Sequence, residues 1–308
     1  MQKENCQKTE VTVIIPTTAE EKRFKSLKNA VSSIREASSK PIGITVVVNG
    51  QRFSSIVVEW IKSQSDINYI YSEKGSAPHA QLIGRQSVQT DFFCFLDDDD
   101  EFLPYAIDTR LEKIKENPGT GVVVTNGYTL KSGTKKIQYQ NLEQLVNSGI
   151  DGLLVSNWLG SCNHLMRTSI VSSSFFDDYH PYYEWTWLAF KLCDKKITLA
   201  AIDTTTFIYN DTEGSASKSL DYRISYEKLA LKMLKKVKER RHKSLIKIKL
   251  SNHYHRMAEY ELKKENFSSA VKFHVKSLAS NGLIKYIMFT RHIIISYIKI
   301  MLKNKRKQ

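Results

Sequence analysis

Several features that would mark other classes of protein are absent from this sequence. The chain opens with the polar residues MQKENCQKTE rather than an apolar leader, and nothing before residue 280 approaches the roughly 18 uninterrupted apolar residues of a membrane-spanning helix. The four cysteines are widely spaced and form no CxxC pair, which argues against a disulfide framework or a zinc site. We therefore expect a cytoplasmic protein with reduced thiols.

Acidic residues are scarce in the last third of the chain. Residues 221–308 hold 23 of the 46 lysines and arginines but only 6 of the 32 aspartates and glutamates, so they carry +17, whereas the first 220 residues carry −3. A basic segment of this kind indicates an anionic partner surface, either membrane lipid or nucleic acid. Its aromatic residues recur at a spacing typical of helix packing, so we favour the inner membrane surface and expect no nucleic-acid binding.

Short β-branched runs alternate with amphipathic segments through the first half of the chain. The runs VTVIIP at 11–16, ITVVV at 44–48 and FFCFL at 92–96 predict buried strands, and residues 68–71 predict a further short strand. The segments at 22–38, 54–63 and 78–89 predict helices. This alternation predicts an α/β domain over residues 1–219, with a mostly parallel central sheet flanked by helices.

Residues 220–308 contain no proline and almost no glycine, which predicts an all-helical basic extension. Within it, 252–281 resembles a single helical hairpin of a tetratricopeptide-like repeat, with a turn near residues 265–266. The apolar segment 283–302 is interrupted by basic residues and is followed by KNKRKQ. It is typical of an amphipathic helix lying on a membrane surface, or of an ordinary packed helix with a solvated tail.

Four consecutive aspartates follow the third predicted strand. Ligands of open parallel sheets bind beyond the carboxyl ends of the strands, which is where Asp97 to Asp100 fall. Alternate residues of an extended chain face the same side, so Asp97 and Asp99 are the candidate ligands of one Mg²⁺ or Mn²⁺ ion, with Asp98 turned toward the sugar or ribose of a donor. The competing interpretation is a solvated acidic loop or a helix cap.

These elements together resemble the family-2 inverting glycosyltransferases, which have a GT-A fold. The resemblance covers about residues 11–215 and is carried by VTVIIPT, ITVVVNG, the spacing of Gly75, Ala80 and Gly84, and FLDDDDEFLP. It implies a hexosyltransferase of bacterial polysaccharide or lipopolysaccharide synthesis that moves a sugar from a UDP-sugar to a saccharide or lipid-linked acceptor. It also implies that Asp97 and Asp99 hold the metal that bridges the donor phosphates.

The same resemblance assigns donor-binding residues. Pro16 and Thr17 would line the nucleoside pocket, and Asp98 would contact the donor. Asn49 stands where the family often has an aspartate, and its amide offers both a donor and an acceptor to a uracil edge. Arg85 is either a ligand of the donor phosphate or an exposed helix residue.

The position of the general base is where this sequence departs most from the family pattern. The family places a Glu-Asp pair before an aromatic helix, and this chain has Glu184 followed by Trp185. Glu184 is therefore the predicted base, with Asp177 and Asp178 in reserve; a helix-capping role for Glu184, or an inactive homologue, are the alternatives. The aromatic residues Trp185, Trp187 and Phe190 favour core packing over stacking on a sugar.

Two further segments have counterparts in the family. The stretch 158–167 would border the acceptor, with His164 packed in the interior, and 209–217, which contains Gly214, would form a lid over the donor. Two other classes of protein compete with the glycosyltransferase interpretation. A nucleotidyltransferase is disfavoured because PTTAEEKRF after the first strand has no glycine, and a scaffold protein with a basic tail would leave the aspartates without a role.

Overall fold

The computed structural model describes residues 9–212 and 219–305, and its internal contacts divide the chain into two units. The first unit ends at Ser219 and the second begins at Leu220, the position at which the charge and glycine content of the sequence change. The first unit is an α/β domain built on one nine-stranded sheet, and the second consists of helices.

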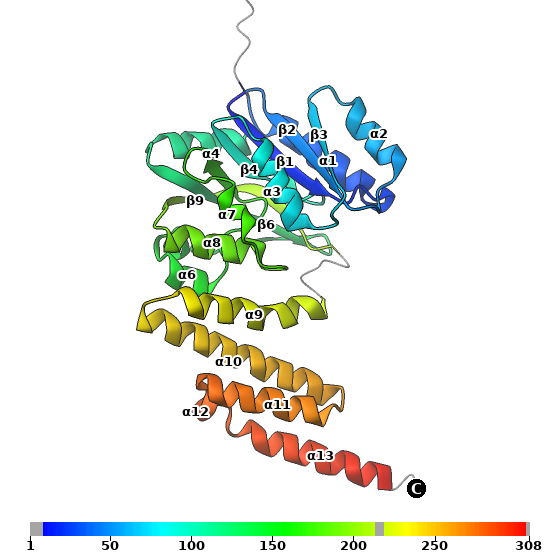
Figure 1. Cartoon of the computed structure of the whole chain (residues 1–308), viewed down its shortest axis with the longest axis vertical. Coiled ribbons are helices and arrows are strands. Elements are labelled where there is room, and N and C mark those ends of the chain that lie inside the picture. The colour runs from blue at the N-terminus through cyan, green and yellow to red at the C-terminus, as the bar shows by residue number, and fades with distance from the viewer. Residues whose placement is uncertain (1–8, 213–218, 306–308) are drawn as a thin grey trace, which may run out of the picture. The chain divides into compact units, whose positions relative to one another are not determined.

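The first half of the sheet is parallel and follows the β-branched runs of the sequence (Figure 1). Its strands are ordered β3-β2-β1-β4, and each pairs in parallel with its neighbour. Helices connect them because parallel neighbours need a crossover. The predicted strands are confirmed within two residues at each end: β1 (Val11–Thr17), β2 (Gly43–Asn49), β3 (Ile67–Ser72) and β4 (Phe92–Phe95).

The second half of the sheet is mixed, which corrects the expectation of a mostly parallel sheet. The chain passes through α5 (Leu142–Asn147) and α6 (Ile150–Val155) and enters β8 (His164–Arg167) running antiparallel to both β4 and β6. β6 pairs in parallel with β9 and antiparallel with β7, and β5 pairs antiparallel with β9. The bounds of these strands are β5 (Glu101–Phe102), β6 (Thr120–Lys131), β7 (Thr134–Ile137) and β9 (Thr198–Asn210).

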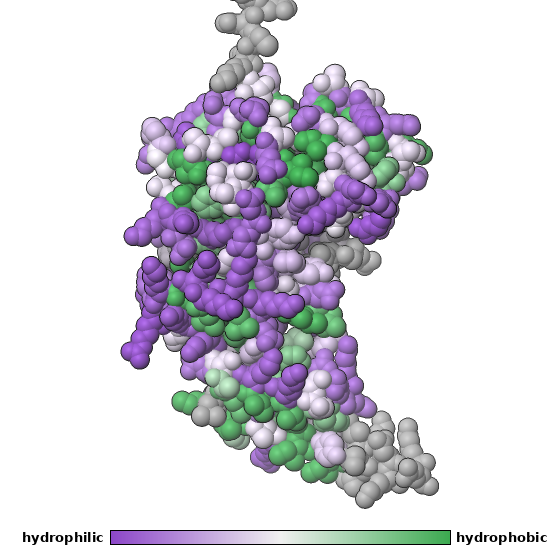
Figure 2. All heavy atoms as spheres, viewed as in Figure 1, coloured by the Kyte–Doolittle hydropathy of each residue, from purple (hydrophilic) through white to green (hydrophobic). Residues whose placement is uncertain are grey.

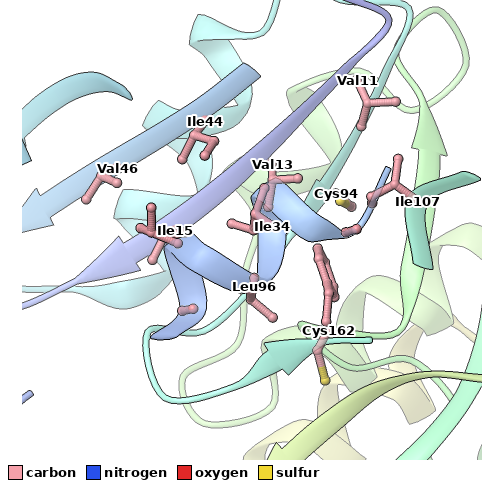
Figure 3. Close-up of a cluster of buried hydrophobic side chains, with 14 of the residues drawn as sticks. Val11, Val13, Ile15, Ile34, Ile44, Val46, Cys94, Leu96, Ile107 and Cys162 are labelled. Carbon is pink, nitrogen blue, oxygen red and sulfur yellow. The ribbon is translucent and has the colours of Figure 1, made fainter. Parts of the chain in front are cut away.

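One face of the sheet packs against α1 (Phe24–Glu36), α2 (Ser55–Ser63) and α4 (Ala106–Lys115). Alternate residues of β1 and β2, among them Val13, Ile15 and Val46, point to this face and toward Ile34 of α1 (Figure 3). The apolar residues at alternate strand positions and those at helical spacing therefore pack into one core. This core fixes the positions of the strand ends, which carry polar residues.

The opposite face packs against α3 (Ala77–Ser87), α7 (Ser174–Asp177) and α8 (Glu184–Asp194). A side chain at Gly84 of α3 would place its Cβ 2.4 Å from Ile14 of β1, so glycine lets this helix approach the sheet closely. Trp187 and Phe190 of α8 are buried and stacked with ring centroids 5.2 Å apart, which confirms the core interpretation for both.

The second unit contains the predicted helical hairpin. α10 (Arg240–Lys263) and α11 (Phe267–Ser277) pack together across a turn at residues 264–266, following α9 (Leu220–Lys236). A π-helical turn (Leu278–Gly282) leads to α12 (Leu283–Tyr286) and α13 (Phe289–Lys305), so the predicted terminal helix is broken at residues 287–288. Each helix in the described ranges is too short or too polar to cross a bilayer.

Candidate active site

A pocket of about 480 Å³ lies at the carboxyl edge of the parallel strands. β1, β2 and β4 end on this edge because they run in the same direction, and the chain after β9 closes one side. The pocket combines carboxylates, cationic side chains and neutral polar groups. This combination suits a charged ligand that binds together with an ion of opposite charge. Its lining residues are Pro16, Thr17, Thr18, Glu20, Lys22, Arg23, Asn49, Arg52, Gly75, Ala77, Asp97, Asp98, Asp99, Tyr209, Asn210 and Thr212.

Asp98 is the carboxylate that anchors the wall of the pocket. It is 3% exposed and accepts a hydrogen bond from Thr17 Oγ1 at 2.5 Å. Arg23, the last residue of the 3₁₀ turn η1 (Glu21–Arg23), donates to both oxygens of Asp98, with Nε 2.9 Å from each. The hydrogen bond with Asp98, aided by the neighbouring carboxylates, raises the pKa of Arg23, so the guanidinium stays charged.

Asp97 and Asp99 also line the pocket, and their charges are only partly compensated. Asp97 accepts from Ser161 Oγ at 2.8 Å, and burial together with the charge of Asp99 raises its pKa to about 7. Asp99 accepts from Thr212 Oγ1 at 3.1 Å and lies 3.2 Å from Arg23, yet burial still raises its pKa. Two crowded carboxylates whose ionised forms are disfavoured would gain from an additional cation.

Asp100 turns away from the pocket and ties the end of β9 to the acidic cluster. Its Oδ1 accepts from the Asn210 amide at 2.9 Å, its Oδ2 is buried without a hydrogen bond, and burial raises its pKa well above the usual range. Asn210 Nδ2 also donates to the Asp99 carbonyl at 2.6 Å. The start of the predicted lid is therefore β strand, and 213–217, including Gly214, lie outside the described residues.

Asn49 lines the pocket at the carboxyl end of β2, where the nucleoside is predicted to bind. Its Nδ2 donates to the Thr17 carbonyl at 2.9 Å, which fixes the orientation of the amide. Its Oδ1 makes no hydrogen bond with any residue in the described ranges and so remains an acceptor for a ligand. Pro16 and Thr17 lie beside it, so three predicted donor-binding residues share one pocket with Asp97 to Asp99.

Arg85 does not reach this pocket. Its guanidinium donates to the carbonyls of Val171 and Thr168 at 2.9 Å and lies over the ring of Phe93, 4.4 Å from the centroid. Burial lowers its pKa. Arg85 is buried rather than exposed, and it joins α3 to the chain after β8, so the structure gives it a packing role in place of the predicted phosphate contact.

Glu184 lies at the start of α8, outside the pocket that holds Asp97 to Asp99, in a small separate pocket with Pro78 and Gln81. Its Oε1 accepts the Tyr182 amide at 3.0 Å, and burial raises its pKa. Asp178 accepts from Trp187 Nε1 at 3.1 Å. Asp177, the other reserve, is exposed at the end of α7. The structure therefore does not bring the predicted base or either reserve into the pocket with Asp97 and Asp99.

Trp185 packs against the end of β4. Its ring contacts Phe95 at 5.4 Å and His164 at 4.9 Å between centroids. His164 is fully buried, its Nδ1 bonds the Gly160 carbonyl at 2.8 Å, and burial lowers its pKa to about 3, so the ring is neutral. The packed interpretation of His164 is confirmed, and Trp185 supplies apolar contacts rather than a proton acceptor.

A fully buried arginine holds the segment that carries Ser161. Arg110 of α4 donates to the carbonyls of Cys162 at 2.6 Å and His164 at 3.1 Å, and to Thr206 Oγ1 at 2.7 Å. Burial lowers its pKa to about 10, which leaves it protonated at neutral pH. Arg110 therefore fixes the turn from which Ser161 donates to Asp97.

The cations of the pocket, and the hydroxyls of Ser161 and Thr212 that bond Asp97 and Asp99, were not predicted from the sequence. Lys22 and Arg23 lie in the 3₁₀ turn that follows β1, within the glycine-free segment PTTAEEKRF, and Arg52 follows β2. The position of these three cations after strands of the parallel half could have predicted them, because the loops after those strands all lie at the carboxyl edge of the sheet. Ser161 and Thr212 gave no signal, since their approach to the aspartates depends on long-range pairing of β8 and β9.

A parallel sheet half with this acidic edge, joined to a mixed half, has the architecture of a GT-A glycosyltransferase. The family model for glycosyl transferase family 2 matches residues 12–170, and the chain belongs to this family. The predicted family and α/β fold class are thus confirmed, and the predicted enzyme class agrees with this family.

Related proteins agree with this assignment. The chain is 25% identical over 174 residues to the teichoic acid poly(glycerol phosphate) polymerase of Staphylococcus epidermidis, covering 53% of this chain and 23% of that protein. It is 27% identical over 127 residues to an uncharacterized glycosyltransferase of Rickettsia conorii, covering 41% and 20%. The chain thus spans about a quarter or less of the length of these relatives.

Among solved structures, residues 1–349 of S. aureus TarS in complex with UDP-GlcNAc have a similar fold. The TM-score is 0.64 at 15% identity, and the match covers 97% of this chain and 93% of the other. The same TarS fragment in complex with UDP matches with a TM-score of 0.62 at 14% identity, covering 97% and 92%.

Proposed function

We propose that this glycosyltransferase moves a sugar from a UDP-sugar to a hydroxyl group of a saccharide or lipid-linked acceptor, with metal dependence and inversion. The observation that carries the proposal is the pocket in which Pro16, Thr17 and Asn49 adjoin Asp97 and Asp99. One end offers neutral polar groups for a nucleoside, and the other offers a charged site for a diphosphate. The UDP and UDP-GlcNAc complexes of TarS, which shares the fold, support this choice of donor.

Uridine suits the neutral end of the pocket. A uracil edge presents an N–H donor between two carbonyl acceptors, and the Asn49 Oδ1 is an acceptor held in place by the bond from Nδ2 to Thr17. The bonded amide leaves one N–H for a uracil carbonyl. The substitution of asparagine for the family's aspartate thus keeps the acceptor that the base requires and removes a charge.

The acidic residues fit Mg²⁺ or Mn²⁺ as a cofactor. Asp97 and Asp99 would hold the ion, because both line the pocket and both have raised pKa values that a cation would lower. No group of three or more His, Cys, Asp or Glu side chains within 9–212 and 219–305 is placed to hold a metal ion, so phosphate oxygens would complete the coordination. When bound, such an ion stabilises the charge of the leaving diphosphate.

The residues of the chain supply orientation and proton transfer. Arg23 and Thr17 hold Asp98 in the wall of the pocket, and Thr212 orients Asp99. Glu184 is the proposed base: its raised pKa makes the carboxylate a stronger proton acceptor than an exposed glutamate. It would remove the proton of the acceptor hydroxyl as that oxygen attacks the anomeric carbon on the side opposite the leaving group, which inverts the configuration.

The acceptor class follows from charge and from the relatives. The relative from S. epidermidis is named as a teichoic acid poly(glycerol phosphate) polymerase, and a poly(glycerol phosphate) chain is anionic. A basic second unit suits an anionic glycopolymer or its lipid-linked precursor. A lipid-linked acceptor and a cytoplasmic nucleotide-sugar would place the enzyme at the inner face of the cell membrane, as a peripheral protein.

One observation favours a second candidate function. Trp185 occupies the position of the family's catalytic aspartate and packs against Phe95 and His164. A chain that had lost its base would bind a nucleotide-sugar without turning it over. This second candidate is an inactive homologue with an intact donor pocket.

A panel of UDP-, GDP- and CDP-sugars, incubated with and without Mn²⁺, separates these possibilities. We expect Mn²⁺-dependent release of UDP and no release of other nucleotides. Binding of UDP without release from any donor, in the presence of candidate acceptors, would support the inactive homologue. Absence of both UDP binding and turnover would contradict the proposed donor.

We expect Arg23→Met to weaken binding of UDP by about tenfold in the presence of Mn²⁺. Without the guanidinium, Asp98 and Asp99 lose their cationic partner and face the diphosphate uncompensated. The measurement is calorimetric titration with UDP. Lys25→Met, on the exposed side of α1, is the matched control and should keep the wild-type Kd; equal affinity in both variants would contradict the role of Arg23.

We expect Glu184→Gln to lower the transfer rate by about a hundredfold. Burial raises the pKa of Glu184, and the base acts as the carboxylate. Wild-type activity should therefore fall as the pH drops through this raised pKa, above the ordinary glutamate range, whereas residual activity of the variant should lose that acid limb. The measurement is a pH profile of kcat for both proteins. An acid limb removed by Asp178→Asn instead would move the base to Asp178.

A further inference from the structure

The last two helices carry large apolar side chains on the surface of the second unit. Ile284 of α12 is 95% exposed and Met288, between the helices, is 72% exposed. Figure 2 shows hydrophobic residues gathered over the surface where Figure 1 places α12 and α13. We name this set the terminal apolar face; its members are Ile284, Ile287, Met288, Ile294, Ile295 and Ile298.

The terminal apolar face is separate from the surface by which α13 packs. Ile293 is buried and Phe289 packs with it against Leu262 and Ala270 of the preceding hairpin. Ile294 and Ile298, four residues apart, are 53% and 51% exposed on another side of the same helix. α13 is therefore apolar on two sides, and packing within the unit uses only one of them.

Basic residues accompany this face. Glu259 and Glu265 border α13 in a pocket with Phe289, His292, Ser296 and Lys299, none of which belongs to the terminal apolar face. Lys285, Arg291 and Lys299 are exposed among the apolar residues. Glu265 is the last acidic residue in the sequence, and nine lysines and arginines follow it. A partner of this surface must therefore offer an apolar layer bordered by negative charge.

We infer that the terminal apolar face docks on the surface of an anionic lipid bilayer. Isoleucine and methionine side chains would enter the boundary between headgroups and acyl chains, and the flanking lysines and arginines would contact lipid phosphates. A second copy of the chain suits this face poorly, because it would oppose the exposed Lys285, Arg291 and Lys299 with the same three cations. A soluble polyanion would pair with the charges and leave the isoleucines exposed to water.

Docking of this kind concerns where the enzyme acts, and it does not depend on the identity of the donor. α13 would lie in the plane of the interface rather than span the bilayer, in keeping with the charged residues along it. The catalytic unit would then be held beside lipid-linked acceptors. The inference adds a named surface and a lipid charge requirement to the proposed function.

The test is sedimentation of the full-length chain with vesicles of phosphatidylcholine alone or mixed equally with phosphatidylglycerol. We expect the wild type to sediment with the anionic vesicles and to remain in solution with the neutral ones. The triple variant Ile284→Gln, Met288→Gln, Ile298→Gln should partition at least about tenfold more weakly, because apolar burial contributes along with charge. Arg291→Gln, Lys299→Gln should weaken binding to a similar degree.

The matched control is the triple variant Ile224→Gln, Leu231→Gln, Ile248→Gln, which changes exposed apolar residues of α9 and α10 and should bind vesicles like the wild type. UDP release measured without vesicles should be equal in all variants, which separates failure of docking from failure of the proposed activity. Two results would overturn the inference: binding that depends on the basic residues alone, which indicates a polyanion site, or a wild-type dimer that the Ile284 triple variant converts to monomer.

Discussion

Replacing Asp99 with asparagine is expected to lower kcat for sugar transfer by about a thousandfold. Asp99 lines the donor pocket, 3.2 Å from Arg23 and 3.1 Å from Thr212, and it is one of two carboxylates proposed to hold the divalent ion. Asparagine keeps the size and the hydrogen bond but removes the charge that binds the ion. The measurement is steady-state release of UDP across a range of Mn²⁺ concentrations.

If Asp99 served only to stabilise the fold, Asp99→Asn would lower the free energy of unfolding. Burial raises the pKa of Asp99, so its ionised form is disfavoured in the folded protein, and a neutral side chain should leave the free energy of unfolding equal or higher. Asp66→Asn, at an exposed pair with Arg35, is the matched control and should keep full activity. Activity of Asp99→Asn close to wild type at saturating Mn²⁺ would contradict the proposed metal site.

The second large effect is expected for Arg110→Met, which should lower the free energy of unfolding by about 3 kcal/mol. Arg110 is fully buried, and its removal leaves the carbonyls of Cys162 and His164 and the hydroxyl of Thr206 without this donor. Methionine fills most of the volume but donates no hydrogen bond. The measurement is equilibrium unfolding in urea.

Arg35→Met is the matched control for this comparison. Arg35 also pairs through its guanidinium, with Asp66 at 2.7 Å, but both side chains are exposed, so its loss should cost at most about 1 kcal/mol. Arg110→Met should also weaken donor turnover at temperatures where it is still folded, because Ser161 loses its fixed approach to Asp97. Equal stability of the two variants would show that the buried carbonyls find other partners.

The parallel half of the fold was predictable because its signals are local. Each strand from β1 to β4 is a β-branched or aromatic run, and the helices between them repeat apolar residues at helical spacing, as Leu27, Val31 and Ile34 do in α1. The mixed half was not predictable in the same way. The direction of β8 depends on which neighbours it joins, and that choice is made by pairing with β4 and β6 rather than by its own four residues.

The candidate site likewise has one part that local sequence signals predict and another that depends on contacts with distant segments. Asp97 to Asp99, Thr17 and Asn49 sit at strand ends, and their meeting follows from strand direction alone. Arg85 was misplaced because its position in α3 left two options, and the interior carbonyls of Thr168 and Val171 that bind it belong to a distant segment. The base stays a prediction: burial and the raised pKa of Glu184 support it, while its separation from the donor pocket leaves the test to kinetics.

The bonds from Asn210 and Thr212 to the acidic cluster bear on the order in which the molecule folds. They join residues separated by 110 to 113 positions in the sequence, whereas β1, β2, β3 and β4 pair within the first hundred residues. Contacts of such long separation form late, because the loop between them must be closed first. During synthesis, the parallel half would assemble while the aspartates still face water, and the nucleotide pocket would be completed only after β9 had been translated and paired.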